Sequence, residues 1–211
     1  MGFVKAVLGL FESPDETIKG LKKNPDGAKM FFGAMIFFSA IYGFVYGFLA
    51  GDASTAAWYL IKFPATLFLT GLVPYITLYI VIKVFGLKMS PGDLVASLSI
   101  TFAITMIVAI AILPLNVLYT YTGHSPAVIH SFSLFIAIIA GLIYLAKTYR
   151  ILGSAEEGTA IVAMLISAVI ILFVMTQFVD IFFNISDATG HSGFIMEEMM
   201  TNTAQKASIV R

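Results

Sequence analysis

The chain contains no cysteine and few charged residues, and both shortages narrow the class of protein. Without Cys there is no disulfide, no thiolate metal site and no cysteine nucleophile. Charged residues make up 11% of the 211 residues, whereas a soluble domain typically carries about a quarter. The 12 Lys and Arg balance the 12 Asp and Glu, so no basic surplus favours binding to nucleic acid.

Catalytic motifs are also missing from the sequence. It has no G-x-S-x-G turn, no Walker loop, no dinucleotide fingerprint and no pair of aspartates within an apolar stretch. We therefore expect no enzymatic activity and no cofactor.

Apolar residues dominate what is present, at 59% of the chain, with a mean hydropathy of +0.96. A helix needs about twenty apolar residues to cross a membrane. Five continuous, non-alternating stretches qualify, over residues 30–50, 58–85, 94–119, 127–146 and 159–183. They predict an all-α polytopic membrane bundle of five transmembrane helices. The second and third stretches exceed one span, so we expect tilt or a break near Pro64, Pro74 or Pro114.

Basic residues gather on one side of these predicted spans. Nine of the 12 lie there, namely Lys5, Lys19, Lys22, Lys23, Lys29, Lys83, Lys88, Lys147 and Arg150. By the positive-inside rule, the N-terminus is cytoplasmic and the C-terminus external or lumenal. The expected location is the cytoplasmic membrane of a prokaryote, or an endomembrane in a eukaryote.

The segment before the first span, residues 1–29, is predicted to be amphipathic and interfacial. Phe3, Val7, Leu10 and Phe11 recur at helical spacing, so the first eleven residues are expected to lie flat on the cytoplasmic membrane surface. The polar tail at residues 184–211 is expected outside, with a short helix over about 194–205.

A second helix is predicted after Ser13-Pro14-Asp15-Glu16, which has the residues of a helix start. Ile18 and Leu21 fall on one side of it and the lysines at 19, 22 and 23 on the other. Lys19, Lys22 and Lys23 are predicted to bind lipid headgroups or, alternatively, to dock a cytoplasmic partner. Ser90-Pro91-Gly92-Asp93 repeats the start signal before the third span.

Small residues form a stripe along the first span, at Ser39, Gly43, Gly47 and Gly51. A spacing of four brings them to one helix face, where another backbone can approach closely. The partner is either another span of the same chain or, through self-association or assembly, another membrane subunit.

Polar residues within the spans are the candidates for a binding site, since an intramembrane ionisable group is costly. Lys62, Asn116, His130 and Asp180 form a candidate site near the outer rim. Each also has a structural interpretation. Lys62 can snorkel, Asn116 can satisfy backbone groups freed by Pro114, and the other two lie where a span meets water.

The three histidines, His124, His130 and His191, all fall on the predicted outer side. No spacing places two of them as ligands on one helix. We therefore assign no metal site and keep them only as candidates.

Three segments resemble the Ypt-interacting-protein (Yip) domain family of five-span membrane proteins. They are Phe11–Ile18 before the first span, Val84–Ser90 between the second and third, and Tyr149–Gly153 followed by Gly158–Ala160 before the fifth. The resemblance implies a cytoplasmic N-terminus and a lumenal or external C-terminus, and it implies no catalytic residues.

Together these features favour a non-enzymatic membrane scaffold, adaptor or accessory subunit, with lipids and other membrane subunits as partners. The alternative is a small transporter or channel with a polar site near the outer rim, which needs polar groups converging within the membrane.

Overall fold

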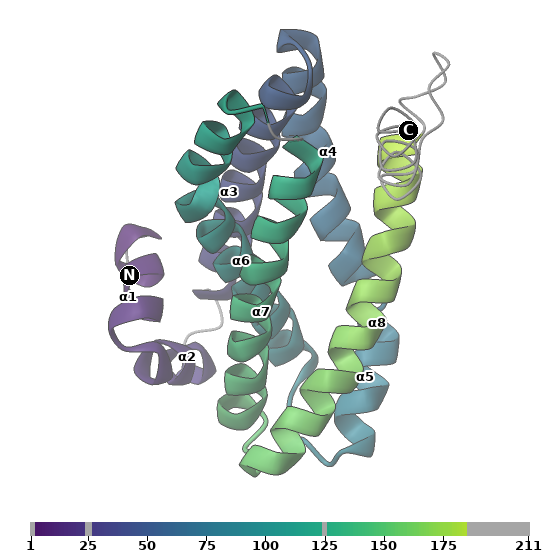
Figure 1. The fold of residues 1–211 in the computed structure, drawn as a ribbon. Coiled ribbons are helices and arrows are strands. Elements are labelled where there is room, and N and C mark those ends of the chain that lie inside the picture. The colour runs from purple at the N-terminus through teal and green to yellow at the C-terminus, as the bar shows by residue number, and fades with distance from the viewer. Residues whose placement is uncertain (1–2, 24–26, 124–125, 185–211) are drawn as a thin grey trace, which may run out of the picture.

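The computed structural model describes residues 3–23, 27–123 and 126–184, and every regular element in these ranges is an α-helix (Figure 1). The helices are α1 (Phe3–Glu12), α2 (Pro14–Lys23), α3 (Gly27–Ala50), α4 (Ala53–Leu72), α5 (Tyr75–Val84), α6 (Pro91–Tyr121), α7 (Pro126–Leu152) and α8 (Glu157–Asn184). The predicted tail helix over about 194–205 lies outside the described residues.

Four of the described helices, α3, α6, α7 and α8, are long and apolar enough to cross a membrane. The pair α4 and α5 passes the same test only when taken together, with a bend of 40° between them. The predicted all-helical membrane bundle is thus confirmed, with four candidate spans, or five if the bent pair counts as one.

The bend falls at Pro74, one of the three prolines where a break was expected. Pro64 and Pro114 lie inside α4 and α6 without ending either helix. A proline removes one backbone N–H and crowds the preceding turn, which a packed membrane helix can tolerate. Near Pro74 the chain also has Gly71, whose low helix propensity weakens the same turn.

α6 is the central helix of the bundle. It packs against α3 and α7, while α4 packs on α3 and α8, and α5 on α8. Of its apolar stretch 61% is buried, against 28% in each of α7 and α8. A helix that is apolar on all sides suits this position, because it meets neighbours all round.

The ends of the helices differ little from the predicted spans. α6 begins with the predicted start signal, in which the Ser90 hydroxyl accepts from the Asp93 N–H and the Asp93 carboxylate accepts from the Ser90 N–H. α7 continues past the predicted end at 146 to Leu152, and this extra turn carries Lys147 and Arg150.

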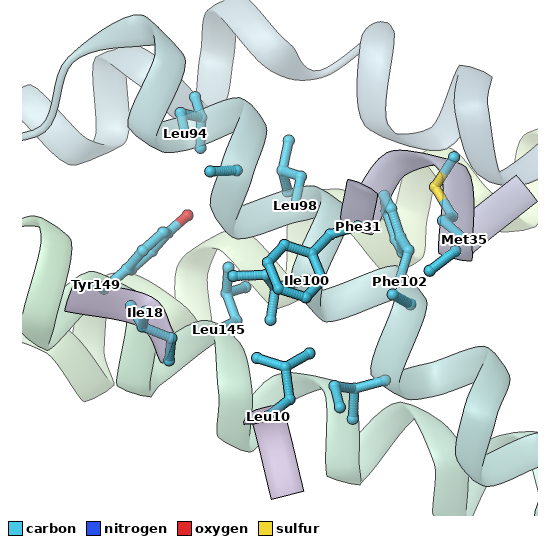
Figure 2. Close-up of a cluster of buried hydrophobic side chains, with 14 of the residues drawn as sticks. Leu10, Ile18, Phe31, Met35, Leu94, Leu98, Ile100, Phe102, Leu145 and Tyr149 are labelled. Carbon is cyan, nitrogen blue, oxygen red and sulfur yellow. The ribbon is translucent and has the colours of Figure 1, made fainter. Parts of the chain in front are cut away.

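α1 and α2 pack against the bundle through side chains that belong to its core. Figure 2 shows Leu10 of α1 and Ile18 of α2 beside Leu145 and Tyr149 of α7. All four side chains are fully buried. The N-terminal helices are therefore a folded part of the structure.

The membrane-facing side predicted for α1 is partly wrong. Leu10 is buried and Val7 half-buried against the bundle, whereas Val4, Leu8 and Phe11 are exposed. Apolar residues occur on two sides of this helix, so their spacing alone does not say which side meets protein. The side chain of Phe3 lies outside the described part.

Candidate functional site

Four polar side chains meet where α3, α6 and α7 come together, and each is at most 2% exposed. The Tyr42 hydroxyl lies 3.0 Å from Nδ1 of His130, and Nδ2 of Asn116 lies 3.4 Å from the same nitrogen. Ser133 donates from Oγ to Oδ1 of Asn116 at 2.6 Å. We call Tyr42, Asn116, His130 and Ser133 the polar cluster.

The His130 ring takes part in the hydrogen bonds of the polar cluster through Nδ1. The amide nitrogen of Asn116 faces the imidazole, and the single proton of the Ser133 hydroxyl has two acceptors within reach, Oδ1 of Asn116 at 2.6 Å and the Ile129 carbonyl at 3.0 Å. Nδ1 of His130 thus lies within hydrogen-bond distance of both Asn116 and Tyr42. Nε2 is buried, with no hydrogen-bond partner among the described residues. A buried polar atom left in this way costs about 1–3 kcal/mol.

Aromatic rings enclose the polar cluster. The ring of Tyr46 stands edge-on to His130 with centroids 4.4 Å apart, and Phe63 of α4 packs edge-on to Tyr42 at 5.3 Å. Such rings keep water out, which strengthens the hydrogen bonds inside.

Lys62 is linked to the polar cluster through two tyrosine rings. Its Nζ lies 5.9 Å from the ring centroid of Tyr59, and the rings of Tyr59 and Tyr46 are 5.5 Å apart. The structure therefore brings together some, but not all, of the four residues of the predicted outer-rim site. Asn116 and His130 are in contact, Lys62 is linked through two tyrosines, and the side chain of Asp180 lies outside the described part.

Two of the structural interpretations made from sequence are wrong. Asn116 was assigned to backbone groups freed by Pro114, yet its amide bonds side chains of α7. His130 was placed within reach of water, yet it is 2% exposed. Both residues lie on helix faces that pack against another helix. The position of a residue along a span does not show on which face of the helix it lies.

Tyr42 and Ser133 are cluster members that the sequence interpretation missed. Ser133 follows His130 by three residues, the spacing of neighbours on one helix face, so a search for polar pairs within a span would have found it. Tyr42 had no such signal beyond its place next to Gly43.

No group of three His, Asp, Glu or Cys side chains within the described ranges is placed to hold a metal ion. His124 and His191 fall outside those ranges. The polar cluster supplies a single imidazole, already bonded to Tyr42 and Asn116 through Nδ1.

The small-residue stripe of α3 packs against α4 of the same chain. A Cβ on Gly43 would collide with the Tyr59 carbonyl oxygen, one on Gly47 would lie 2.8 Å from Cα of Ala56, and one on Gly51 would lie 2.8 Å from the Thr55 hydroxyl. Ser39 is buried and donates to the Ile36 carbonyl. The stripe thus has a partner within the chain.

A second close contact, which the sequence interpretation did not single out, joins α6 to α7. The hydroxyls of Thr101 and Thr105 each donate to the carbonyl four residues earlier, at 2.8 and 2.9 Å. They present a small, satisfied surface to Gly141, whose Cβ position would meet the Thr105 hydroxyl and lie 3.0 Å from the Thr101 carbonyl oxygen.

At the opposite end of the bundle, α2 is fastened to α7 by charge. Asp15 pairs with Lys147 at 3.0 Å and with Arg150 at 3.4 Å. The hydrogen bond from Lys147, with the charge of both cations, holds the pKa of the Asp15 carboxyl below its usual range. Farther along α2, Lys22 donates to the Ser154 hydroxyl at 3.2 Å.

Two loops meet beside this contact. The backbone N–H of Lys88 donates to the Gly153 carbonyl at 2.9 Å, and Leu87 is buried against Gly153. The loop between α5 and α6 is also held by Lys83, which donates to the Met89 carbonyl at 3.0 Å. We call α2 with loops 85–90 and 153–156 the clamped end.

The clamped end brings together the three segments on which the family resemblance was based. They come from residues 11–18, 84–90 and 149–160, far apart in sequence. No family model, curated protein or solved structure matches this chain.

Proposed function

We propose that this chain is a non-enzymatic integral membrane scaffold or adaptor, an accessory subunit of a membrane complex, of the Yip-domain type. In this proposal α4 and α5 form one bent span, so the bundle has five. The N-terminus and the clamped end are cytoplasmic, and the C-terminus is external or lumenal. The surplus of Lys and Arg on the side of the clamped end supports this orientation.

The clamped end is the observation that carries the proposal. Three segments, tied by Asp15 to Lys147, by Lys22 to Ser154 and by Lys88 to Gly153, form one continuous surface. A surface held in one conformation before binding loses little entropy when a partner docks. Lys19 and Lys22 are exposed on it, beside Glu16, and offer charges to a partner or to lipid headgroups.

The interior of the bundle also supports a scaffold. The hydroxyls of Thr101 and Thr105 on central α6 bond carbonyls of their own helix, and Asn116 bonds side chains of α7. Polar groups that are hydrogen-bonded to one another in this way contribute to the packing of the helices in the bundle.

A small transporter or channel is the alternative, and two observations favour it. Nε2 of His130 is a buried polar atom with no hydrogen-bond partner among the described residues, and α4 is broken from α5 at Pro74. Broken helices and intramembrane polar groups are typical of transport sites. Substrate-dependent flux in proteoliposomes, lost in His130→Gln and kept in the exposed-site control Ser131→Ala, would select this alternative.

The test of the scaffold is purification from native membranes in mild detergent, followed by mass and subunit identification. We expect a companion at fixed stoichiometry that is lost when Lys19, Lys22 and Lys23 are all changed to Glu. Lys62→Glu, on the proposed outer side, is the control for a charge reversal at a single site away from the clamped end and should keep the companion. A lone monomer or homo-oligomer from native membranes would contradict the proposal.

A further inference from the structure

The side of α1 that faces away from the bundle is apolar. Val4, Leu8 and Phe11 are 66%, 50% and 50% exposed, and spacings of four and three bring them to one face. Ala6 and Leu10, also four residues apart, are buried on the opposite side. Apolar surface of this kind is stable only when something covers it.

A narrow polar edge separates these two faces. Lys5 and Glu12 are both exposed, and a separation of seven residues, or two turns, places them in line. α1 therefore has three sides, of which one is docked on protein, one is apolar and uncovered, and one is charged.

We infer that α1 is seated in one leaflet of the membrane, with Val4, Leu8 and Phe11 in contact with lipid acyl chains and Lys5 and Glu12 at the headgroups. The inference rests on the proposed membrane placement of the bundle. It keeps Phe11 in contact with lipid, but puts Val4 and Leu8 there in place of Val7 and Leu10, which the spacing suggested. Ten residues of helix rise about 15 Å, half of what a span needs, so α1 stays within one leaflet.

The level of α1 along the length of the bundle supports its placement within a leaflet. Tyr144 of α7 donates to the Leu10 carbonyl at 2.6 Å, and its neighbour Ile143 is an outward-facing apolar residue, 61% exposed. Figure 1 shows α1 beside the bundle and not beyond its end.

The contacts that α2 makes with α7 lie beyond those of α1, nearer the C-terminal end of α7. Lys147 and Arg150, which bind Asp15, lie one to two turns closer to the end of α7 than Tyr144 does. Moving along α7 towards its end, the contacts pass from the apolar α1 to the charged α2. The layers of a lipid leaflet follow the same order, from apolar acyl chains to charged headgroups.

Lipid accounts for this surface better than a soluble partner does. Tyr144, which bonds the Leu10 carbonyl of α1, follows a stretch of α7 whose exposed residues, including Ile139 and Ile143, are also apolar. A soluble protein covering Val4 and Leu8 would have to enter the layer that these residues occupy. Lys5 and Lys19 are exposed, and in this placement they offer cations to lipid phosphate.

The chain is well suited to a direct test, because it has one Trp and no Cys. In a Trp58→Phe background, single Trp residues are placed by Val4→Trp, Leu8→Trp or Phe11→Trp, with Lys19→Trp on exposed α2 as the control. The proteins are reconstituted in phosphatidylcholine and phosphatidylglycerol vesicles with doxyl groups on the acyl chains. We expect quenching at positions 4, 8 and 11 to exceed that at position 19 by about twofold or more.

Spin labelling provides a second measurement with a smaller substitution. A label on Leu8→Cys should be more accessible to oxygen than to a polar nickel complex, and a label on Lys19→Cys the reverse. Position 8 behaving like position 19 in both experiments would overturn the inference. So would a label at position 8 that is shielded from oxygen and nickel alike, because that result means protein covers the face. Neither readout depends on a companion subunit, so failure here is separable from failure of the scaffold proposal.

Discussion

Asp15 of α2 lies 3.0 Å from the ammonium of Lys147, which sits on the last turns of α7. The pair joins two helices that lie far apart in the sequence, α2 and α7. Neither side chain is fully buried, at 45% and 28% exposed respectively, so water screens the attraction. Its main effect is to fix where α2 sits, while the buried Leu10 and Ile18 supply most of the docking energy.

Asp15→Asn should loosen α1 and α2 without unfolding the bundle. The amide keeps the size of the side chain but loses the charge that both cations bind. We expect a loss of about 0.2–1 kcal/mol, the range of exposed ion pairs, and faster tryptic cleavage after Lys19 and Lys22. Glu16→Gln, a neighbouring exposed acid, is the matched control and should digest like the wild type.

The same carboxyl predicts an acid-sensitive docking of the N-terminal helices. The pKa of Asp15 lies below its ordinary value of 3.8 in the folded protein. Its contribution is therefore complete above about pH 3.8 and is lost as the pH falls through the lower folded pKa. A spin label on Leu8→Cys should become more mobile over that acid range. Label mobility in Asp15→Asn should not change there, and an equal change in both proteins would contradict the assignment.

Ser133→Ala should weaken the contact between α6 and α7. It removes the donor to Oδ1 of Asn116 inside a buried cluster, and interhelical hydrogen bonds of this kind average about 0.6 kcal/mol with a maximum near 1.7. A double-mutant cycle with Asn116→Leu, measured by unfolding in mixed micelles, should give coupling of that size. Independent, additive losses from the two changes would mean that the bond contributes nothing.

Two glycines of α3 should respond in opposite ways to alanine. A Cβ on Gly43 collides with the backbone oxygen of Tyr59, whereas one on Gly33 has nothing within 4 Å. Gly43→Ala should lower the thermal stability because α3 and α4 must move apart. Gly33→Ala should leave it unchanged or raise it by up to about 1 kcal/mol through helix propensity. Equal effects at the two positions would show that close approach at Gly43 is unimportant.

Features that depend on composition along the chain were predictable from sequence. Apolar runs located the long helices, and Ser90 with Asp93 marked the start of α6. The spacing of Gly43 and Gly47 indicated a close contact, because a glycine stripe has the same meaning whichever helix it meets.

Features that depend on which helix faces meet were not predictable. Asn116 and His130 were candidates separately. Their contact joins α6 to α7 and also involves Tyr42 of α3, so it depends on how three helices pack. α1 has apolar residues on two sides, so only its docking shows that Leu10 faces protein and Leu8 does not. Among the three prolines, the break at Pro74 similarly required knowledge of the neighbours.

The attachment of the N-terminal helices also sets an order of events during synthesis. Leu10 bonds Tyr144 across 134 residues, and Asp15 bonds Arg150 across 135. At about 5–20 residues per second, translation needs about 7–27 seconds to supply these partners after the first helices have left the ribosome. Throughout that interval α1 and α2 lack their partners on α7 and have only earlier helices such as α3 to pack on, so their attachment to α7 comes late in synthesis.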